Sequence, residues 1–393
     1  GFAPSPLLTR LLGRQAYGDY SFLLSVFAVF MIFVSSGVTD GVRKFIAEER
    51  DRPNWSDHVV GFYFRLALVL GVVGAAFLAW VASSGTLVQF VGDARFETYF
   101  YLLAGLVLAA QFREYTRRTL MGFGLEHYSE TLRVLNRVVF VASGIALAYL
   151  GYGVVGVLVG NILGSGVAAV LGGALILRKV SLVDAVRPPS RSFPRREMLS
   201  FNGMSIVLVL LITSLYHVDV MMIRVLVDST QTAYYKVALT LAEFLWLVPS
   251  SLQMVLLHST SNLWANDGVE RVEEIASRVT RYAVLLTALL AIGIGSLAST
   301  VVPILWPDTY VAALTPLYVL LPGAVGFALA RPILAISQGK GDLSLLILPT
   351  AIAAGLNIVL NVVLISRFGI TGAAIATSVS YGSMFLLHVW GAR

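Results

Sequence analysis

The sequence predicts an all-α, polytopic membrane protein made of two parallel six-helix bundles, in which most of the first helix of the first bundle is missing. Three observations support this class. Hydrophobic residues make up 57% of the chain and charged residues only 13%, against roughly 25% charged residues in an ordinary soluble domain. The apolar residues gather in stretches long enough to cross a bilayer, and these stretches recur in two similar halves.

Apolar stretches long enough to span the hydrocarbon core of a bilayer occur at eleven places. Because lipid offers the backbone no hydrogen-bond partner, segments of this length must be helices. The expected spans are 17–38, 59–82, 98–112, 134–150, 153–177, 203–227, 234–257, 282–306, 310–330, 345–366 and 370–390. The third span is expected to continue as a polar helix end.

Lys and Arg are concentrated in one set of alternate loops, which is the cytoplasmic set by the positive-inside rule. This set contains the basic stretch 178–196 and the C-terminus, so we expect both on the cytoplasmic face of the plasma (inner) membrane. Arg113 and Arg331 are counted among the cytoplasmic loop residues. The loops on the opposite face are short and leave little room for an outer catalytic domain.

Four patterns of the first half recur in the second half in the same order. The offset is nearly constant, at 215 to 217 residues, which indicates an internal duplication of the kind found in transporters. The matched positions are Tyr20 with Tyr235, Arg65 with Arg281, Gly122-Phe123-Gly124 with Gly339-Lys340-Gly341, and Tyr152-Gly153 with Phe368-Gly369. Six spans return the chain to the side on which it started, so the two halves run parallel.

The same offset predicts the domain organisation. The span 203–227 requires a partner that ends near residue 12, so residues 1–12 are expected to be the tail of a helix whose start is absent, and Arg10 then matches Arg224. The predicted parts are an N-terminal lobe at 1–177, truncated at its start, a cytoplasmic basic linker at 178–196 and a C-terminal lobe at 197–393.

No constellation of residues in the sequence indicates catalysis. The five histidines are scattered, with no HExxH motif and no pair at helical ligand spacing, and the chain has no Cys. A phosphate-binding lysine loop is also absent. We therefore expect no enzyme activity, no cofactor and no metal site. The net charge of +6 is interpreted as the orientation bias of a membrane protein, so no nucleic acid partner is expected.

Four arginines lie within or at the edges of the predicted spans, where a charge is costly and normally faces a partner or a cavity. Arg65 and Arg281 occupy corresponding positions near the cytoplasmic starts of their helices, and Arg10 and Arg224 correspond near the outer ends. One interpretation is that these side chains extend to the lipid headgroups. The other is that they bind an anionic group, for which the planar guanidinium is well suited.

Two acidic residues, Asp219 and Glu243, also lie within predicted spans. Each could pair with a nearby basic residue or a helix end. Alternatively, one of them could be a proton or cation site that couples transport to an ion gradient. Asn357 and Asn361 are expected to be interhelical hydrogen-bond partners.

Three longer motifs are more specific than any single charge. One runs from Leu12-Gly13 to Tyr20-Ser21, the second covers 218–223, and the third runs from Leu356-Asn357 to Ala376-Thr377. Together they resemble the polysaccharide (O-antigen type) flippase family, the Wzx-like members of the MOP superfamily. The resemblance covers nearly the whole chain. It implies a MATE/MOP-like fold with two six-helix lobes around a cleft that opens alternately to each side.

The resemblance also implies a flippase, which moves a polyprenyl-diphosphate-linked oligosaccharide from the cytoplasmic to the outer leaflet by alternating access. The expected partners are this lipid-linked oligosaccharide, membrane lipids and H+ or Na+, and the protein is expected to act as a monomer. The candidate substrate-binding residues are Arg65, Arg281, Arg10 and Arg224, and the candidates for ion coupling are Asp219 and Glu243.

Two other functions fit parts of the pattern. A multidrug or small-molecule cation antiporter of the same superfamily would favour a cleft rich in carboxylates, whereas the repeated charges here are arginines. An integral-membrane glycosyltransferase or ligase would need a long outer loop with acid, His or Arg residues. The longest outer loop, at about 81–97, contains Asp93 and Glu97 but no His.

Overall fold

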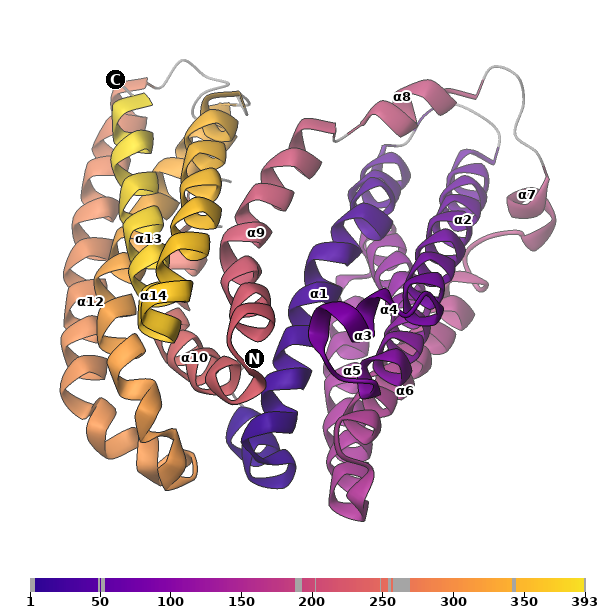
Figure 1. Cartoon of the computed structure of the whole chain (residues 1–393). Helices are drawn as coiled ribbons and strands as arrows, with labels where there is room; N and C mark the ends of the chain where they lie inside the picture. Colours follow the sequence, from indigo (N-terminus) through magenta and orange to yellow (C-terminus); the bar gives the residue numbers. More distant parts are fainter. Residues whose placement is uncertain are drawn as a thin grey trace. The chain divides into compact units, whose positions relative to one another are not determined.

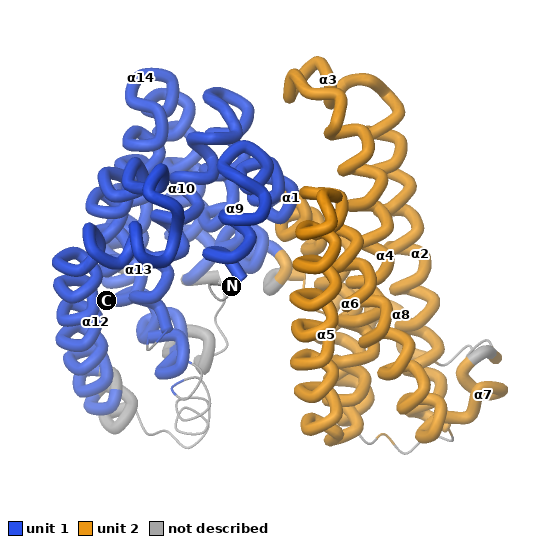
Figure 2. The backbone as a smooth tube through the Cα atoms, turned by 90° about the horizontal axis from the view of Figure 1, so that it is seen from below, with its two compact units in different colours: residues 1–25, 207–393 blue, residues 26–206 orange. Residues whose placement is uncertain are grey.

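The computed structural model describes residues 4–48, 50, 54–187, 193–201, 203–247, 249–253, 256, 269–340 and 344–391. Within these residues the protein has helices and no strands, which confirms the predicted all-α class. The chain forms two compact units (Figure 2): residues 1–25 and 207–393 make up unit 1, and residues 26–206 make up unit 2. The predicted N-terminal lobe, 1–177, includes residues 1–25, which the structure groups with the second half of the chain. The lobe boundaries stay a prediction from the repeat.

Unit 2 contains the helices that carry the predicted spans of the first half. The first helix, α1 (Ser5–Ala47), contributes its second half to this unit. Helices α2, α4 and α6 run side by side (Figure 1). The remaining elements of the unit are α2 (Trp55–Ser83), α3 (Thr86–Val91), α4 (Arg95–Gly122), α5 (Glu126–Leu147), η1 (Ala148–Tyr152), α6 (Gly153–Ile176), α7 (Leu182–Val186) and α8 (Arg195–Ser200).

Unit 1 combines the start of α1 with the helices of the second half. Helices α13 and α14 pack along each other, and α12 packs on α13. The elements of the unit after α1 are α9 (Gly203–Leu226), α10 (Ser229–Ala242), η2 (Glu243–Trp246), α12 (Val269–Leu305), η3 (Asp308–Ala313), α13 (Leu314–Lys340) and α14 (Ser344–Gly391).

Seven of the described helical stretches are long and apolar enough to cross a membrane. This number is smaller than the eleven predicted spans because two stretches, Glu126–Ile176 and Leu346–Trp390, each contain two predicted spans. Two further predicted spans lie in α4 and α10. Helix α10 has only 14 residues, and the second half of α4 is rich in charged side chains. The predicted polytopic membrane class is confirmed.

The internal repeat is visible in the backbone. The chain turns at Gly153 (φ 52°, ψ −132°) before α6 and again at Gly369 (φ 56°, ψ −136°) within α14. These nearly identical conformations strongly disfavour a residue with a side chain. Three residues later, a Cβ atom at Gly156 or at Gly372 would lie 2.9 Å or 2.0 Å from backbone atoms of the preceding helix. Both halves therefore end in the same tight helical hairpin.

A second correspondence lies at the start of each half. Helix α1 is broken at Gly13 (φ 73°, ψ 176°), and the break between α9 and α10 falls around Asp228, 215 residues further along. The Asp228 side chain caps α10 by accepting a hydrogen bond from the Gln231 backbone N–H at 2.7 Å. The short helix before Gly13 thus corresponds to the end of α9, as the offset predicts.

Two arginines that were assigned to cytoplasmic loops lie inside helices. Arg113 lies within α4, and Arg331 lies within α13, in the apolar stretch Asp308–Ala335. Arg113 lies in the polar helix end that was predicted to follow span 98–112. The loop assignment was wrong for Arg331, because the hydrophobic window ends at residue 330 and the helix continues to Lys340. Arg331 is consequently an ionisable residue within a membrane-spanning helix. It was not among the candidate residues predicted from the sequence.

The described end of the basic linker and the residues just after it, 197–200, pack within unit 2. Phe193 and Met198 belong to the hydrophobic core of this unit, and the Phe193 ring lies 5.5 Å from the Trp55 ring. Arg50 and Glu197 form an ion pair at 2.6 Å. The end of the linker is therefore held against the first bundle by apolar burial and by charge.

Candidate functional site

A buried carboxylate lies where three helices of unit 1 meet. Asp219 of α9 is completely shielded from solvent. Its Oδ2 atom accepts hydrogen bonds from the Tyr235 hydroxyl of α10 at 2.5 Å and from the Thr377 hydroxyl of α14 at 3.1 Å. Its Oδ1 atom accepts one from the Val220 backbone N–H at 2.8 Å. These donors are all neutral.

The polar cluster continues along α14, whose two arms meet at the turn of Gly369. The Asn357 amide donates to the Thr377 hydroxyl at 3.4 Å, and the Asn361 amide donates to the Asn357 carbonyl oxygen at 3.1 Å. All three side chains are buried. The Oδ1 atom of Asn361 has no hydrogen-bond partner among the described residues. The Asn357 bond joins the two arms of α14, as expected of an interhelical partner, whereas the described bond of Asn361 lies within one arm.

This carboxylate cluster has the chemistry of a proton or small-cation site. None of the ion pairs between described residues involves Asp219. A buried ionised carboxylate without a cation is costly, so a bound proton or cation stabilises it. Carboxylate, amide and hydroxyl oxygens are also the ligands that hard cations prefer. No group of three or more His, Cys, Asp or Glu residues that could hold a metal ion occurs in the described part of the chain.

Glu243, the other acidic candidate, has a different environment. It begins η2, and its carboxylate lies 3.8 Å from the Lys236 ammonium with 36% of the side chain exposed. This geometry matches the structural interpretation, in which Glu243 pairs with a neighbouring basic residue. Its role in ion coupling stays a prediction.

Arg224, one of the predicted substrate-binding residues, takes part in a buried ion pair. Its Nε atom donates to Asp19 Oδ1 at 2.8 Å, and the Ser229 hydroxyl donates to the same oxygen at 2.6 Å. Asp19 is fully buried and the Arg224 side chain is 9% exposed. The pair joins α1 to α9 within unit 1. Arg224 therefore has an internal counterion in this structure.

The other predicted arginines of unit 1 lie apart from this ion pair. Arg10 donates from Nη2 to the carbonyl oxygens of Ile304 and Leu305, at 3.1 and 3.4 Å. These are the last carbonyls of α12, where a cation is favoured by the helix dipole. Arg281 lies on the exposed surface of α12. The substrate-binding roles of Arg10 and Arg281 stay predictions.

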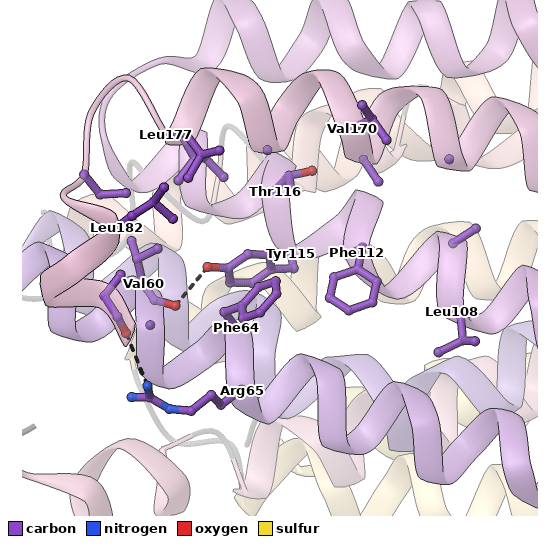
Figure 3. A pocket seen from close by; sticks show the side chains of 18 of the residues that line it. Val60, Phe64, Arg65, Leu108, Phe112, Tyr115, Thr116, Val170, Leu177 and Leu182 are labelled. Atoms are coloured by element: carbon purple, nitrogen blue, oxygen red, sulfur yellow. Dashed lines mark hydrogen bonds between the residues drawn. The ribbon is translucent and has the colours of Figure 1, made fainter. Parts of the chain in front are cut away.

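Arg65 of unit 2 lies beside the linker helix α7. Its Nη1 atom donates to the carbonyl oxygen of Ala185 at 3.2 Å (Figure 3). One turn earlier on α2, Gly61 leaves space for the same carbonyl, since a Cβ atom there would lie 1.8 Å from the Ala185 oxygen. A further turn earlier, Asp57 accepts a hydrogen bond from the Ser181 backbone N–H at 3.3 Å. One face of α2 therefore holds α7.

Arg331 lies in a group of aromatic side chains of unit 1. Its guanidinium carbon is 5.1 Å from the centre of the Phe327 ring and 5.7 Å from that of Trp246. Its Nη1 and Nη2 atoms donate to Gln253 Oε1 and to the Tyr216 hydroxyl, both at 3.0 Å. The Nε atom is buried and has no hydrogen-bond partner among the described residues. This arrangement is hereafter the Arg331 site.

The Arg331 site has no carboxylate partner within the part of the chain that the structure describes. Neutral oxygens and ring faces stabilise the guanidinium, and no carboxylate among the described residues balances its charge. An intramembrane cation in this state attracts an anionic ligand. The signal in the sequence was weak, because Arg331 follows the apolar window by one residue and resembles a loop residue.

Solved structures of MATE transporters share this fold. An inward-facing structure of a multidrug resistance MATE family transporter of the MOP superfamily aligns with a TM-score of 0.79 at 17% identity, over 99% of this chain and 93% of the other. An outward-facing structure of such a transporter gives 0.63 at 17% identity, over 99% and 90%. A mutant MATE transporter from Vibrio cholerae gives 0.62 at 13% identity, over 98% and 95%. The protein is thus a multi-pass membrane protein with the MATE fold.

The family is defined by the sequence. The chain belongs to the polysaccharide biosynthesis protein family, which it matches over residues 1–257, and this confirms the predicted resemblance. It is also 28% identical, over 164 residues, to an uncharacterized membrane protein of Methanocaldococcus jannaschii. That match covers 40% of this chain, and the chain spans about a third (31%) of the length of this curated relative.

Proposed function

We propose that the protein is a flippase that moves a polyprenyl-diphosphate-linked oligosaccharide from the cytoplasmic to the outer leaflet of the plasma membrane by alternating access, without enzymatic activity. Membership of the polysaccharide biosynthesis protein family supports this class of cargo. The MATE fold supports the transport mechanism, because two repeated bundles can rock about a central site. In the proposed orientation the linker 178–196 and the C-terminus are cytoplasmic.

The observation that carries the proposal is the Arg331 site. A diphosphate that passes the hydrocarbon needs compensating cations and hydrogen-bond donors, and Arg provides both in a planar arrangement. Aromatic rings such as Trp246 and Phe327 offer apolar faces to the sugar rings beside it. A cation antiporter would gain nothing from an intramembrane arginine that pairs with no carboxylate among the described residues. The Arg331 site therefore favours an anionic cargo over a cationic drug.

Coupling to an ion gradient is assigned to Asp219. A carboxylate shared by α9, α10 and α14 changes its preferred packing when it binds H+ or Na+, because Tyr235 and Thr377 then lose or exchange their acceptor. Binding at one site can thus bias the positions of three helices. Arg65, Arg281 and Arg10 stay secondary candidates for contact with the cargo, and the buried pairing of Arg224 favours a structural role.

The test uses full-length protein in proteoliposomes that contain a lipid-linked oligosaccharide, with translocation followed by a membrane-impermeant reagent. The Arg331→Gln variant should transport about 10 to 100 times more slowly than the parent, since charge-assisted hydrogen bonds contribute about 1.5–3 kcal/mol. Arg331→Lys keeps the charge and loses the planar fork, so its rate should be intermediate. Arg278→Gln is the matched control, because Arg278 is exposed and pairs with Glu274 on the helix surface.

The same vesicles separate the two transport functions. The multidrug antiporter is the second candidate, and the buried Asp219 carboxylate is the observation that favours it. Parent protein that exports a cationic dye but leaves the lipid-linked oligosaccharide in place would overturn the flippase proposal. An unchanged oligosaccharide rate in Arg331→Gln would remove the Arg331 site from the mechanism.

A further inference from the structure

Unit 2 contains a large cavity, of which the transport proposal uses Arg65 alone, as a secondary candidate. It has a volume of about 890 Å³ and lies between α2, α4 and α6, with α7 at one end (Figure 3). The side chains that line it are mostly apolar and include Phe64, Leu108, Phe112 and Val170. A volume of this size is typical of small-molecule and lipid sites. We call this cavity the lateral groove.

Two polar side chains that line the lateral groove, Tyr115 and Thr116, are satisfied within the protein. The Tyr115 hydroxyl donates to the Val60 carbonyl at 2.9 Å, and the Thr116 hydroxyl donates to the Arg113 carbonyl at 3.0 Å. A polar ligand would therefore bury its groups against apolar walls without compensation, which is costly. A hydrocarbon chain meets no such penalty. The lining thus selects an apolar chain.

Glycines on α6 fall into two groups with different surroundings. A Cβ atom at Gly160 or Gly164 would lie 2.5 Å or 2.7 Å from backbone atoms of α5, so these glycines permit close helix packing. By contrast, a Cβ atom at Gly166 or Gly173 would meet no atom within 4 Å. Both of these residues line the lateral groove. Their missing side chains serve no contact within the described part of unit 2 and keep the groove open.

The charge at the end of the lateral groove is positive. Arg65 lines the groove margin and bonds to Ala185 of α7, and Arg178 and Lys179 are exposed in the turn between α6 and α7. The acidic groups nearby are Asp57, which accepts from Ser181, and Asp184, which pairs with Arg187 at 3.6 Å. Among the described residues of this region, the four basic side chains of Arg65, Arg178, Lys179 and Arg187 therefore outnumber the two carboxylates of Asp57 and Asp184. An anionic headgroup complements this end.

We propose that the lateral groove binds an acyl chain of an anionic bilayer phospholipid, with the phosphate of the headgroup beside Arg65. The lining helices α2 and α6 belong to membrane-spanning stretches, so lipid chains are the solvent of this surface. The proposed topology puts the α7 end at the cytoplasmic interface, where anionic headgroups and basic residues attract each other. Because α7 closes that end, a bound lipid would also support the docking of the linker on α2. This inference goes beyond the flippase proposal and does not require it.

The experiment uses purified full-length protein in phosphatidylcholine vesicles that contain phosphatidylglycerol with a photoreactive acyl chain. Labelled peptides are identified by mass spectrometry. The parent should be labelled within α4 and α6, in the segments 105–116 and 166–177. Gly166→Leu combined with Gly173→Leu fills the groove, and labelling there should fall about tenfold, the change expected when contact with about two methylene groups is lost.

The control for this pair is Gly355→Leu in α14, because a Cβ atom at Gly355 also meets no atom within 4 Å. It adds the same side chain to a helix outside the groove and should leave groove labelling unchanged. Equal labelling in the parent and in the filled groove would overturn the proposal. Gly172→Leu is unsuitable as a control, since a Cβ atom there would lie 2.7 Å from Thr116.

Two further experiments test which headgroup Arg65 prefers and which lipid supplies the hydrocarbon chain in the groove. With Arg65→Gln, phosphatidylglycerol should lose its advantage over photoreactive phosphatidylcholine in groove labelling, and an advantage that persists would refute the role of Arg65. Added long-chain polyprenyl diphosphate should leave the labelling in place. Its complete loss would assign the groove to the cargo lipid and overturn the phospholipid as occupant. Both readouts are independent of transport, so they can fail while the flippase proposal stands.

Discussion

Removing the charge of Arg224 should destabilise the protein more than it changes substrate binding. The Arg224→Gln substitution leaves the fully buried Asp19 carboxylate without the guanidinium that lies 2.8 Å away. Breaking one partner of a buried ion pair costs about 3–5 kcal/mol in soluble proteins. In membranes, polar interactions contribute less to the free energy of unfolding, because the polar groups of the unfolded state also find partners. In addition, the Ser229 hydroxyl continues to donate to Asp19 in the variant. We therefore expect a loss of about 2–3 kcal/mol in the free energy of unfolding.

The assay is reversible unfolding of the purified protein in mixed lipid and detergent micelles, followed by circular dichroism. A double variant, Asp19→Asn with Arg224→Gln, removes both charges, so most of the lost stability should return. Arg278→Gln serves as the control, because its ion pair with Glu274 is exposed, and exposed helix pairs contribute about 0.3–0.5 kcal/mol.

The reasoning would be refuted if Arg224→Gln unfolded like the parent protein. A variant of normal stability with lost oligosaccharide transport would restore Arg224 to the substrate-binding role that the sequence predicted. If the double variant were less stable than both single variants, the two residues would not act as a pair. In each case the buried ion pair would no longer explain why these charges lie in the membrane.

Two other predictions concern coupling and topology. Asp219→Asn keeps an acceptor for Tyr235 but carries no charge. Transport should therefore proceed down the cargo gradient and lose its dependence on a pH or Na+ gradient. If the variant kept the full dependence on that gradient, Asp219 would return to a structural role. The chain has no cysteine of its own, so single cysteines can be introduced as Ser190→Cys, in a part of the linker outside the described residues, and as Thr309→Cys in η3. The two should be labelled from opposite faces of the membrane, and labelling of both from the same face would overturn the proposed topology.

Local features of the sequence were sufficient to predict the fold class. Apolar length predicts membrane helices because the bilayer thickness and the backbone hydrogen-bond requirement leave few alternatives. The repeat was also readable, since Gly153 and Gly369 are required by a backbone conformation that other residues avoid. Such glycines act through their own φ and ψ angles. These glycines can therefore be recognised in both halves of the sequence without knowledge of how the surrounding helices pack.

The partners of the charged residues followed only from the tertiary structure. Asp19 and Arg224 are 205 positions apart, and Thr377 reaches Asp219 from 158 positions away. A hydropathy pattern gives the length of a helix but neither its rotation nor its neighbours, so it cannot tell a buried ion pair from a substrate site. The environment of Arg331 depends in the same way on how α9 and α13 pack.

What the sequence alone determined about this protein is the membrane class, the duplication and the family, because these depend on composition, periodicity and short motifs. The tertiary structure decided which charges have an internal partner. It joined Arg224 to Asp19, set Asp219 among neutral donors, and left Arg331 without a carboxylate among the described residues. The physical reason is that the energy of an intramembrane charge depends on the few atoms within hydrogen-bond distance, and helix packing brings those atoms together from distant parts of the chain.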